Sequence, residues 1–136
     1  MTYLVDSSVC IAILRDTSAL ASERFQRALT GQESILLSSV VLYELWHGVH
    51  NSARPAENAA TLQKFLRGPL VVLPFDEDDA RVAGEVRAVL QRSGRTIGAY
   101  DTMIAAQCLR RDITVVTANV SEFSRVKGLK WEDWTK

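Results

Sequence analysis

Short apolar runs alternate along the chain with longer segments in which apolar residues recur at helical spacing. Four runs have the length and composition of buried strands, and they cover residues 3–5, 34–38, 70–73 and 113–116. Helical spacing extends over residues 20–29, 40–49, 56–66, 79–90 and 100–109. The last two segments open with acidic residues, and Gly68 and Gly94 are placed to end helices.

Strands that recur with helices between them require crossover connections, which favour a parallel sheet covered on both faces. The predicted fold class is therefore α/β in three layers, with a central, mostly parallel sheet of four to five strands flanked by helices. A chain of 136 residues can fill one core and is too short for two ordinary domains. We expect a single domain spanning residues 1–136.

Composition narrows the possible functions. The chain is 47% hydrophobic and 24% charged, and no apolar run is long enough to span a membrane. Sixteen basic residues balance sixteen acidic ones, which excludes a protein that holds nucleic acid by overall charge alone. No export leader precedes the first predicted strand, so the cytoplasm is the expected location. Cys10 and Cys108 lie in apolar stretches without metal-ligand spacing, and we expect buried, reduced thiols.

Acidic residues stand where an α/β fold places its chemistry. Open parallel sheets bind ligands beyond the carboxyl ends of their strands, and Asp6 follows the first predicted strand directly. Asp6 could instead only cap the next helix. Glu44 is the sole acid of the apolar helix 40–49, where an unpaired charge is costly. Alternatively, Glu44 shares a narrow exposed stripe with His47.

Further polar residues follow the same pattern near the C-terminus. Asp101 opens an apolar helix, either as a cap or as a functional acid, and Asn119 and Glu122 follow the last apolar strand run. Acids at the mouths of several elements of one parallel fold suggest a shared cluster. Clustered carboxylates need a compensating cation, and oxygen ligands favour Mg²⁺, with Mn²⁺ able to substitute. Such a site hydrolyses phosphate esters in nucleases and phosphatases.

Five motifs follow one another along the chain: Asp6-Ser-Ser, Glu44, IGAYDTMIAA (97–106), TANVSEF (117–123) and RVKGL (125–129). In their order and spacing they resemble VapC-type toxins of the PIN-domain family. This resemblance spans nearly the whole chain. It implies a metal-dependent endoribonuclease toxin of a type II toxin–antitoxin pair that hydrolyses RNA phosphodiesters with metal-activated water, leaving a 5′-phosphate and a 3′-hydroxyl.

The resemblance also assigns roles to single residues. It implies that Asp6 and Asp101 bind the metal ion and that Glu44 is a further ligand or positions the attacking water. The fourth position of the family lies at Asn119 to Glu122, where relatives carry Asp in place of Asn119, so Glu122 is a possible substitute. Ser8 and Thr117 are expected to orient the carboxylates by hydrogen bonds. A further departure is Ala99, where many relatives have proline.

Partners follow from the same resemblance. The motifs and the ending GLKWEDW (128–134) resemble enteric toxins that cut initiator tRNA in its anticodon loop. The family implies an antitoxin whose helix fills an apolar groove, a homodimer within a toxin–antitoxin hetero-oligomer, and DNA binding only through the antitoxin. An excess of apolar side chains on the early helices fits such a groove: Ile11, Leu14, Leu20, Phe25, Leu29, Leu42, Tyr43, Leu45 and Trp46. The alternative is that they all belong to the core.

Rival functions account for less of the sequence. Glu44 and His47 have the spacing of a di-iron ligand pair, but no second pair exists and the strands contradict a helical bundle. A haloacid-dehalogenase phosphatase would need a second Asp two residues after Asp6, where Ser8 stands. A receiver-like domain would use Asp76 as its phosphoacceptor, but the acidic residues 77–79 that follow it are better interpreted as a solvated helix start. A catalytically silent PIN-fold module that acts with an antitoxin on DNA is the non-enzymatic alternative.

Overall fold

The computed structural model describes all 136 residues and contains one five-stranded sheet in which every neighbouring pair of strands is parallel. The strand order is β3-β2-β1-β4-β5. The strands are β1 (Thr2–Val5), β2 (Ser34–Ser38), β3 (Val71–Leu73), β4 (Thr114–Val116) and β5 (Lys130–Glu132). The predicted fold class is confirmed, and the four apolar runs all form strands.

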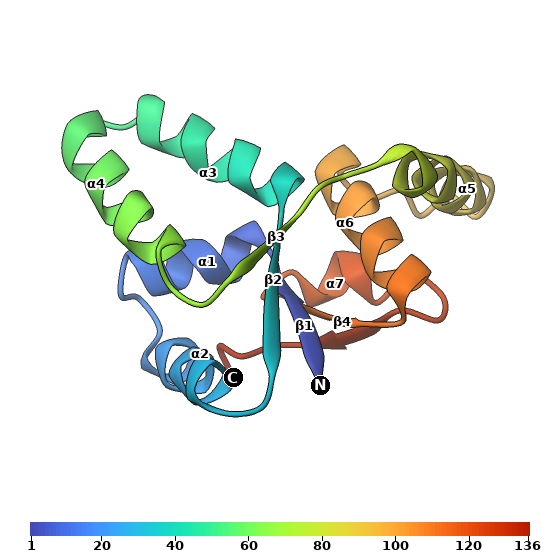
Figure 1. Ribbon diagram of the computed structural model, residues 1–136. Coiled ribbons are helices and arrows are strands. Elements are labelled where there is room, and N and C mark those ends of the chain that lie inside the picture. The colour runs from blue at the N-terminus through green and yellow to red at the C-terminus, as the bar shows by residue number, and fades with distance from the viewer.

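Helices cover both faces of this sheet. From β1 through β2 to β3 the chain moves toward one edge, and then it returns past β1 to β4 and β5. Because crossover connections are right-handed, this reversal sends the two sets of helices to opposite faces. One side carries α1 (Ser7–Leu14), α2 (Ala19–Thr30), α3 (Ser39–His50) and α4 (Pro55–Leu66), and the other carries α5 (Glu77–Arg92), α6 (Ala99–Arg111) and α7 (Val120–Phe123) (Figure 1).

The core lies along the two central strands. Leu4 on β1 and Val115 on β4 are completely buried, as purely apolar strands covered by helices on both faces should be. Cys10 and Cys108 are buried free thiols, as the sequence predicts. No helix combines the length and apolar character needed to cross a membrane.

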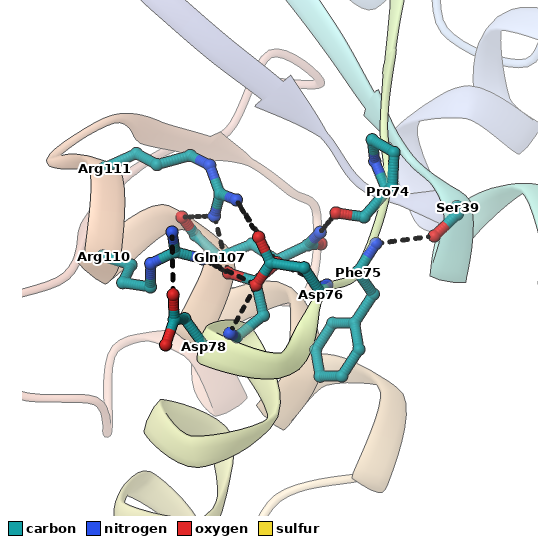
Figure 2. Close-up of polar contacts among 9 residues, drawn as sticks. Ser39, Pro74, Phe75, Asp76, Asp78, Gln107, Arg110 and Arg111 are labelled. Atoms are coloured by element: carbon teal, nitrogen blue, oxygen red, sulfur yellow. Dashed lines mark hydrogen bonds and ion pairs between the residues drawn. The ribbon is translucent and has the colours of Figure 1, made fainter.

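A buried ion-pair network fixes the start of α5 against the end of α6. Asp76 caps α5 in a capping box with Asp79, whose side chain is fully buried. Oδ1 of Asp79 lies 2.7 Å from both Arg110 Nη1 and Arg111 Nη1, and Figure 2 shows the two arginines beside this helix start. The expectation that residues 77–79 are a solvated helix start is therefore wrong for Asp79. It is also wrong that Asp76 is a free phosphoacceptor, because Asp76 binds Arg110 at 2.8 Å.

The carboxyl ends of β1 and β4 define the place where functional residues gather. These neighbouring strands lead in opposite directions along the sheet, β1 toward β2 and β4 toward β5. Crevices at such a reversal are the usual ligand sites of open α/β sheets. The loop after β1, the loop after β4 and the first turns of α3 and α6 all open toward this end.

Candidate functional site

Asp6 occupies the loop between β1 and α1. Its backbone N–H donates to Val116 O at 2.9 Å, which extends the pairing of β1 with β4 by one bond. The carboxylate is 2% exposed, and Oδ1 accepts from the backbone N–H of Val9 at 3.1 Å and from Ser8 Oγ at 2.6 Å. The helix-cap interpretation of Asp6 is therefore correct. Both bonds end on Oδ1, so capping itself does not use the second oxygen.

Two hydroxyls connect the loop after β1 with the loop after β4. Ser8 Oγ donates to Asp6 and also accepts from the backbone N–H of Ala118 at 3.1 Å. Thr117 is fully buried, and its Oγ1 accepts from the backbone N–H of Asn119 at 2.8 Å. Burial raises the pKa of Asp6, while hydrogen bonds from Ser8 and Thr117 act in the opposite direction.

Asp101 and Glu122 meet through Asn119. Asp101 is the third residue of α6, whose cap position is Gly98, so the expectation that Asp101 caps this helix is wrong. Asn119 Nδ2 donates to Asp101 Oδ2 at 2.9 Å and to Glu122 Oε2 at 3.0 Å. These contacts bring the first turn of α6, the loop after β4 and the short helix α7 to one point.

The electrostatics of this pair favour one retained proton. Burial, the hydrogen bond to Glu122 and the charges of Glu122 and Asp6 raise the pKa of Asp101 to about 8. The pKa of Glu122 is lowered because its carboxylate accepts hydrogen bonds from Asp101, the Gly98 backbone and Asn119. At neutral pH the proton shared by the pair therefore resides on Asp101.

Glu44 approaches the same region from α3. Its Oε1 atom is buried and has no hydrogen-bond partner. Burial raises the pKa of Glu44, the Ser7 hydroxyl lowers it, and the nearby charge of Asp6 raises it further. His47 is exposed, whereas Glu44 is half-buried, so the alternative that the two share an exposed stripe is wrong. The backbone thus delivers a desolvated carboxylate close to Asp6.

The donor set is suitable for a hard cation but is not closed around one. No lysine or arginine forms an ion pair with Asp6, Glu44, Asp101 or Glu122. No three acidic, histidine or cysteine side chains converge tightly enough to enclose a metal ion by themselves. Mg²⁺ commonly uses one or two carboxylates and completes its shell with water, so the oxygen donors fit that ion.

A largely apolar pocket of about 130 Å³ lies between α1, α3 and α4, and it adjoins the acids because Glu44 belongs to its lining. Of the nine apolar residues singled out in the sequence, Ile11, Leu14 and Leu45 line this pocket. Phe25 and Leu45 are core residues, whereas Ile11, Leu20 and Tyr43 are exposed, so part of the set is exposed as predicted and the alternative that all nine belong to the core is wrong. Leu20 and Tyr43 are exposed but do not line the pocket.

Near the acids, sequence reasoning missed Ser7 and Tyr100, and it assigned Tyr43 only to the apolar set of the early helices. Ser7 follows Asp6 directly, and its hydroxyl affects the pKa of Glu44. Tyr43 and Tyr100 each precede an acid of the site, and their rings are in contact. The available signal was the repeated Tyr-acid dipeptide, although only the packing of α3 against α6 makes the two copies neighbours.

Known proteins are similar to this chain over nearly its whole length. The PIN domain model matches residues 3–129. The tRNA(fMet)-specific endonuclease VapC of Shigella flexneri is 36% identical over 99% of each chain. Ribonuclease VapC2 of Rickettsia felis is 31% identical over 100% of each chain.

Solved structures agree with these relatives. VapBC2 of Rickettsia felis, bound to a DNA fragment from its promoter, superposes with a TM-score of 0.91 at 29% identity and covers 98% of this chain and 99% of that one. DNA-bound VapBC from Salmonella typhimurium gives a TM-score of 0.89 at 34% identity, with 98% of each chain covered. Because the fold and the full-length sequence similarity agree, the chain belongs to the PIN-domain family and, within it, to the VapC ribonucleases of toxin–antitoxin systems.

Proposed function

We propose that the chain is a Mg²⁺-dependent endoribonuclease whose site comprises Asp6, Glu44 and Asp101, with Asn119 and Glu122 at its fourth corner. The observation that carries this proposal is the gathering of desolvated carboxylates from separate elements without a basic partner. The charges of Asp6 and Glu122 both raise the pKa of Asp101, and that of Asp6 also raises the pKa of Glu44. Such mutual repulsion is costly unless a cation binds.

Different residues of the site would have different roles in the reaction. Asp6 and Asp101 would hold the ion, which when bound would make water more acidic and offset the charge of the scissile phosphate. Ser8 and Thr117 fix the orientation of Asp6 through hydrogen bonds. Glu44 carries an unpaired buried oxygen and a raised pKa, so it is suited to accept a proton from the attacking water. The products would be a 5′-phosphate and a 3′-hydroxyl.

Metal binding can be tested apart from cleavage. Because the cation relieves repulsion, Mg²⁺ should raise the melting temperature of the wild type and should stabilise Asp6→Asn much less. RNA cleavage should require Mg²⁺ or Mn²⁺ and stop in excess chelator, whereas Zn²⁺ should support it poorly because no His or Cys lies within the cluster. Full cleavage in chelator, or identical Mg²⁺ shifts in both proteins, would exclude the metal-dependent mechanism.

Initiator tRNA is the proposed substrate. The Shigella flexneri relative is named for tRNA(fMet) and is 36% identical over nearly its full length. Cleavage of an initiator tRNA transcript should exceed that of an elongator tRNA, with 3′ ends in the anticodon loop. Equal cleavage of both RNAs would reject this substrate while leaving the nuclease intact. If Mg²⁺ supports no cleavage of any RNA, the catalytically silent, antitoxin-dependent alternative is correct.

An antitoxin is the proposed protein partner. The structures most similar to this chain include VapBC complexes bound to DNA. The apolar pocket between α1, α3 and α4 would receive an amphipathic antitoxin helix, and an extended arginine-bearing tail would then reach the acids. The complex would include a toxin homodimer and would bind DNA through the antitoxin. Co-purification with the product of the adjacent reading frame, followed by an RNase assay on the complex, tests the pair.

A further inference from the structure

Two exposed tyrosines meet beside the acidic cluster. Tyr43 lies on α3 and Tyr100 on the first turn of α6, and their ring centroids are 5.5 Å apart at an interplanar angle of 64°. The Tyr100 hydroxyl donates to the Tyr43 hydroxyl at 3.3 Å. The contact therefore joins two helices that belong to opposite faces of the sheet (Figure 1).

Each tyrosine immediately precedes an acid of the proposed site. Tyr43 comes before Glu44, and Tyr100 comes before Asp101. Neighbouring helical residues point about 100° apart, so the acids can face inward while the rings remain at the surface. The hydrogen bond with Tyr43, partial burial and the charges of Tyr43 and Glu44 all raise the pKa of Tyr100, which places the rings within electrostatic reach of the cluster.

The exposure of these rings is large. Tyr43 is 57% exposed and Tyr100 is 40% exposed, although each could bury considerable apolar area. An edge-to-face contact covers one edge and one face, so ring surface remains open to solvent. Neither residue lines the pocket between α1, α3 and α4. The pair is thus a surface distinct from the proposed antitoxin pocket and adjacent to the proposed scissile position.

We propose that Tyr43 and Tyr100 form a stacking platform for one unpaired RNA base beside the scissile phosphate. The inference rests on the proposed nuclease function and names how its substrate is held. Without a metal ion the carboxylates repel the phosphate backbone, so affinity at this end then has to come from neutral parts of RNA. Base faces supply it, because single-stranded RNA is bound largely by stacking on aromatic side chains.

Binding without cleavage tests the platform. A labelled single-stranded RNA of about 12 nucleotides, within the usual range of such sites, would be titrated by fluorescence anisotropy in chelator. Tyr43→Ala and Tyr100→Ala should each weaken binding by about fivefold or more, the loss expected for one stacked base. Tyr43→Phe and Tyr100→Phe keep the ring and should bind within about twofold of wild type. Trp131→Ala on β5 removes another exposed aromatic and serves as the control.

A base-deletion series identifies the occupant. A series of RNAs carries one abasic nucleotide each, at successive positions. One of them should bind the wild-type protein weakly, and its affinity should not fall further with Tyr100→Ala, because the stacked base is already absent. Additive losses at every position, or unchanged binding by both alanine variants, would overturn the platform. If only antitoxin binding falls in those variants, the rings are a protein interface instead. Wild-type cleavage in Mg²⁺ is measured in parallel. Cleavage that persists while the platform test fails rejects only the platform, whereas absence of cleavage rejects the nuclease assignment and the platform that rests on it.

Discussion

The Asn119 side-chain amide nitrogen lies 2.9 Å from Oδ2 of Asp101, and the same nitrogen also donates to Glu122 at 3.0 Å. A neutral donor therefore stands between two carboxylates that would otherwise repel each other. The family resemblance predicts an acid at this position, and the amide found there carries no charge. The difference makes the fourth corner of the site a natural place to test how charge and metal affinity are balanced.

Replacing Asn119 with aspartate should make folding more dependent on metal. Asn119→Asp removes the shared donor and adds a third carboxyl group, so we expect a loss of about 1–3 kcal/mol in unfolding free energy in chelator. Mg²⁺ should restore most of that loss. Thermal melts with and without Mg²⁺ measure it. The control is Asn58→Asp on exposed α4, which adds the same charge and should not increase the stabilisation by Mg²⁺. Equal stabilisation of both variants by Mg²⁺ would contradict the assigned role of Asn119.

Neutralising any of the three principal acids should abolish RNA cleavage while the fold persists. Asp6→Asn, Glu44→Gln and Asp101→Asn each change charge with little change of shape, and in chelator they should melt at or above the wild-type temperature because repulsion falls. Glu57→Gln, an exposed acid on α4, provides a control that keeps full activity. A principal-acid variant that still cleaves RNA at the wild-type rate is not part of the site.

The raised pKa of Asp101 gives a defined pH dependence of stability in chelator. Its folded pKa of about 8 exceeds the unfolded value, so the folded state holds the proton more tightly. Ionising Asp101 therefore lowers the free energy of unfolding. This destabilisation is absent below about pH 4, grows between pH 4 and 8, and is constant above pH 8. Denaturant unfolding of wild type and Asp101→Asn across this range should show the variant gaining relative stability as pH rises. A difference independent of pH would show that Asp101 titrates normally.

The contribution of Asp79 to stability should depend on pH in the opposite direction to that of Asp101. Hydrogen bonds from Arg111, the Asp76 backbone and Arg110 outweigh burial and lower the pKa of Asp79 to about 2. Its stabilising contribution is complete above about pH 4 and is lost as pH falls toward 2. Asp79→Asn should cost about 3–5 kcal/mol at neutral pH, because two arginines lose a buried partner.

The exposed neighbour Asp78 provides the matched control for that measurement. Asp78 lies 4.0 Å from Arg110, and Asp78→Asn should cost less than about 1 kcal/mol. Chemical denaturation of both variants at neutral pH and near pH 2 separates the two roles. Equal costs for Asp79→Asn and Asp78→Asn at neutral pH would refute the importance of the buried network.

Filling the apolar pocket with a larger side chain should weaken antitoxin binding without destabilising the protein. Gly48 lines the pocket on α3, and a Cβ atom there would meet nothing within 4 Å. Gly48→Leu should therefore raise helix stability by about 0.5–1 kcal/mol, yet it should block an incoming helix and weaken the complex at least tenfold. Gly84→Leu on α5 has equal free space and no pocket. Unchanged affinity of Gly48→Leu for the antitoxin would exclude this pocket as its site.

The chain's apolar periodicity was sufficient to predict most of the fold. Buried parallel strands must be apolar on both faces, which made β1, β2 and β4 visible as short runs. The edge strands β3 and β5 each expose two of their three residues, but β3 is wholly apolar whereas Lys130 and Glu132 of β5 are charged, so only β3 left a comparable signal. Asp79 was misread for a related reason. Its burial depends on Arg110 and Arg111, which are more than thirty residues away and reach it only after α5 packs on α6.

For the site, the sequence by itself determined which acids follow strands or interrupt apolar helices, because those local patterns are costly without a function. Tertiary structure alone decided how they combine. It made Asp6 a cap that uses only one oxygen, kept Asp101 from capping its helix, and connected Asp101 to Glu122 through Asn119. It also paired Tyr43 with Tyr100 across 57 positions. Charge coupling and ring contacts depend on distances between separate elements, and local residue order does not encode those distances.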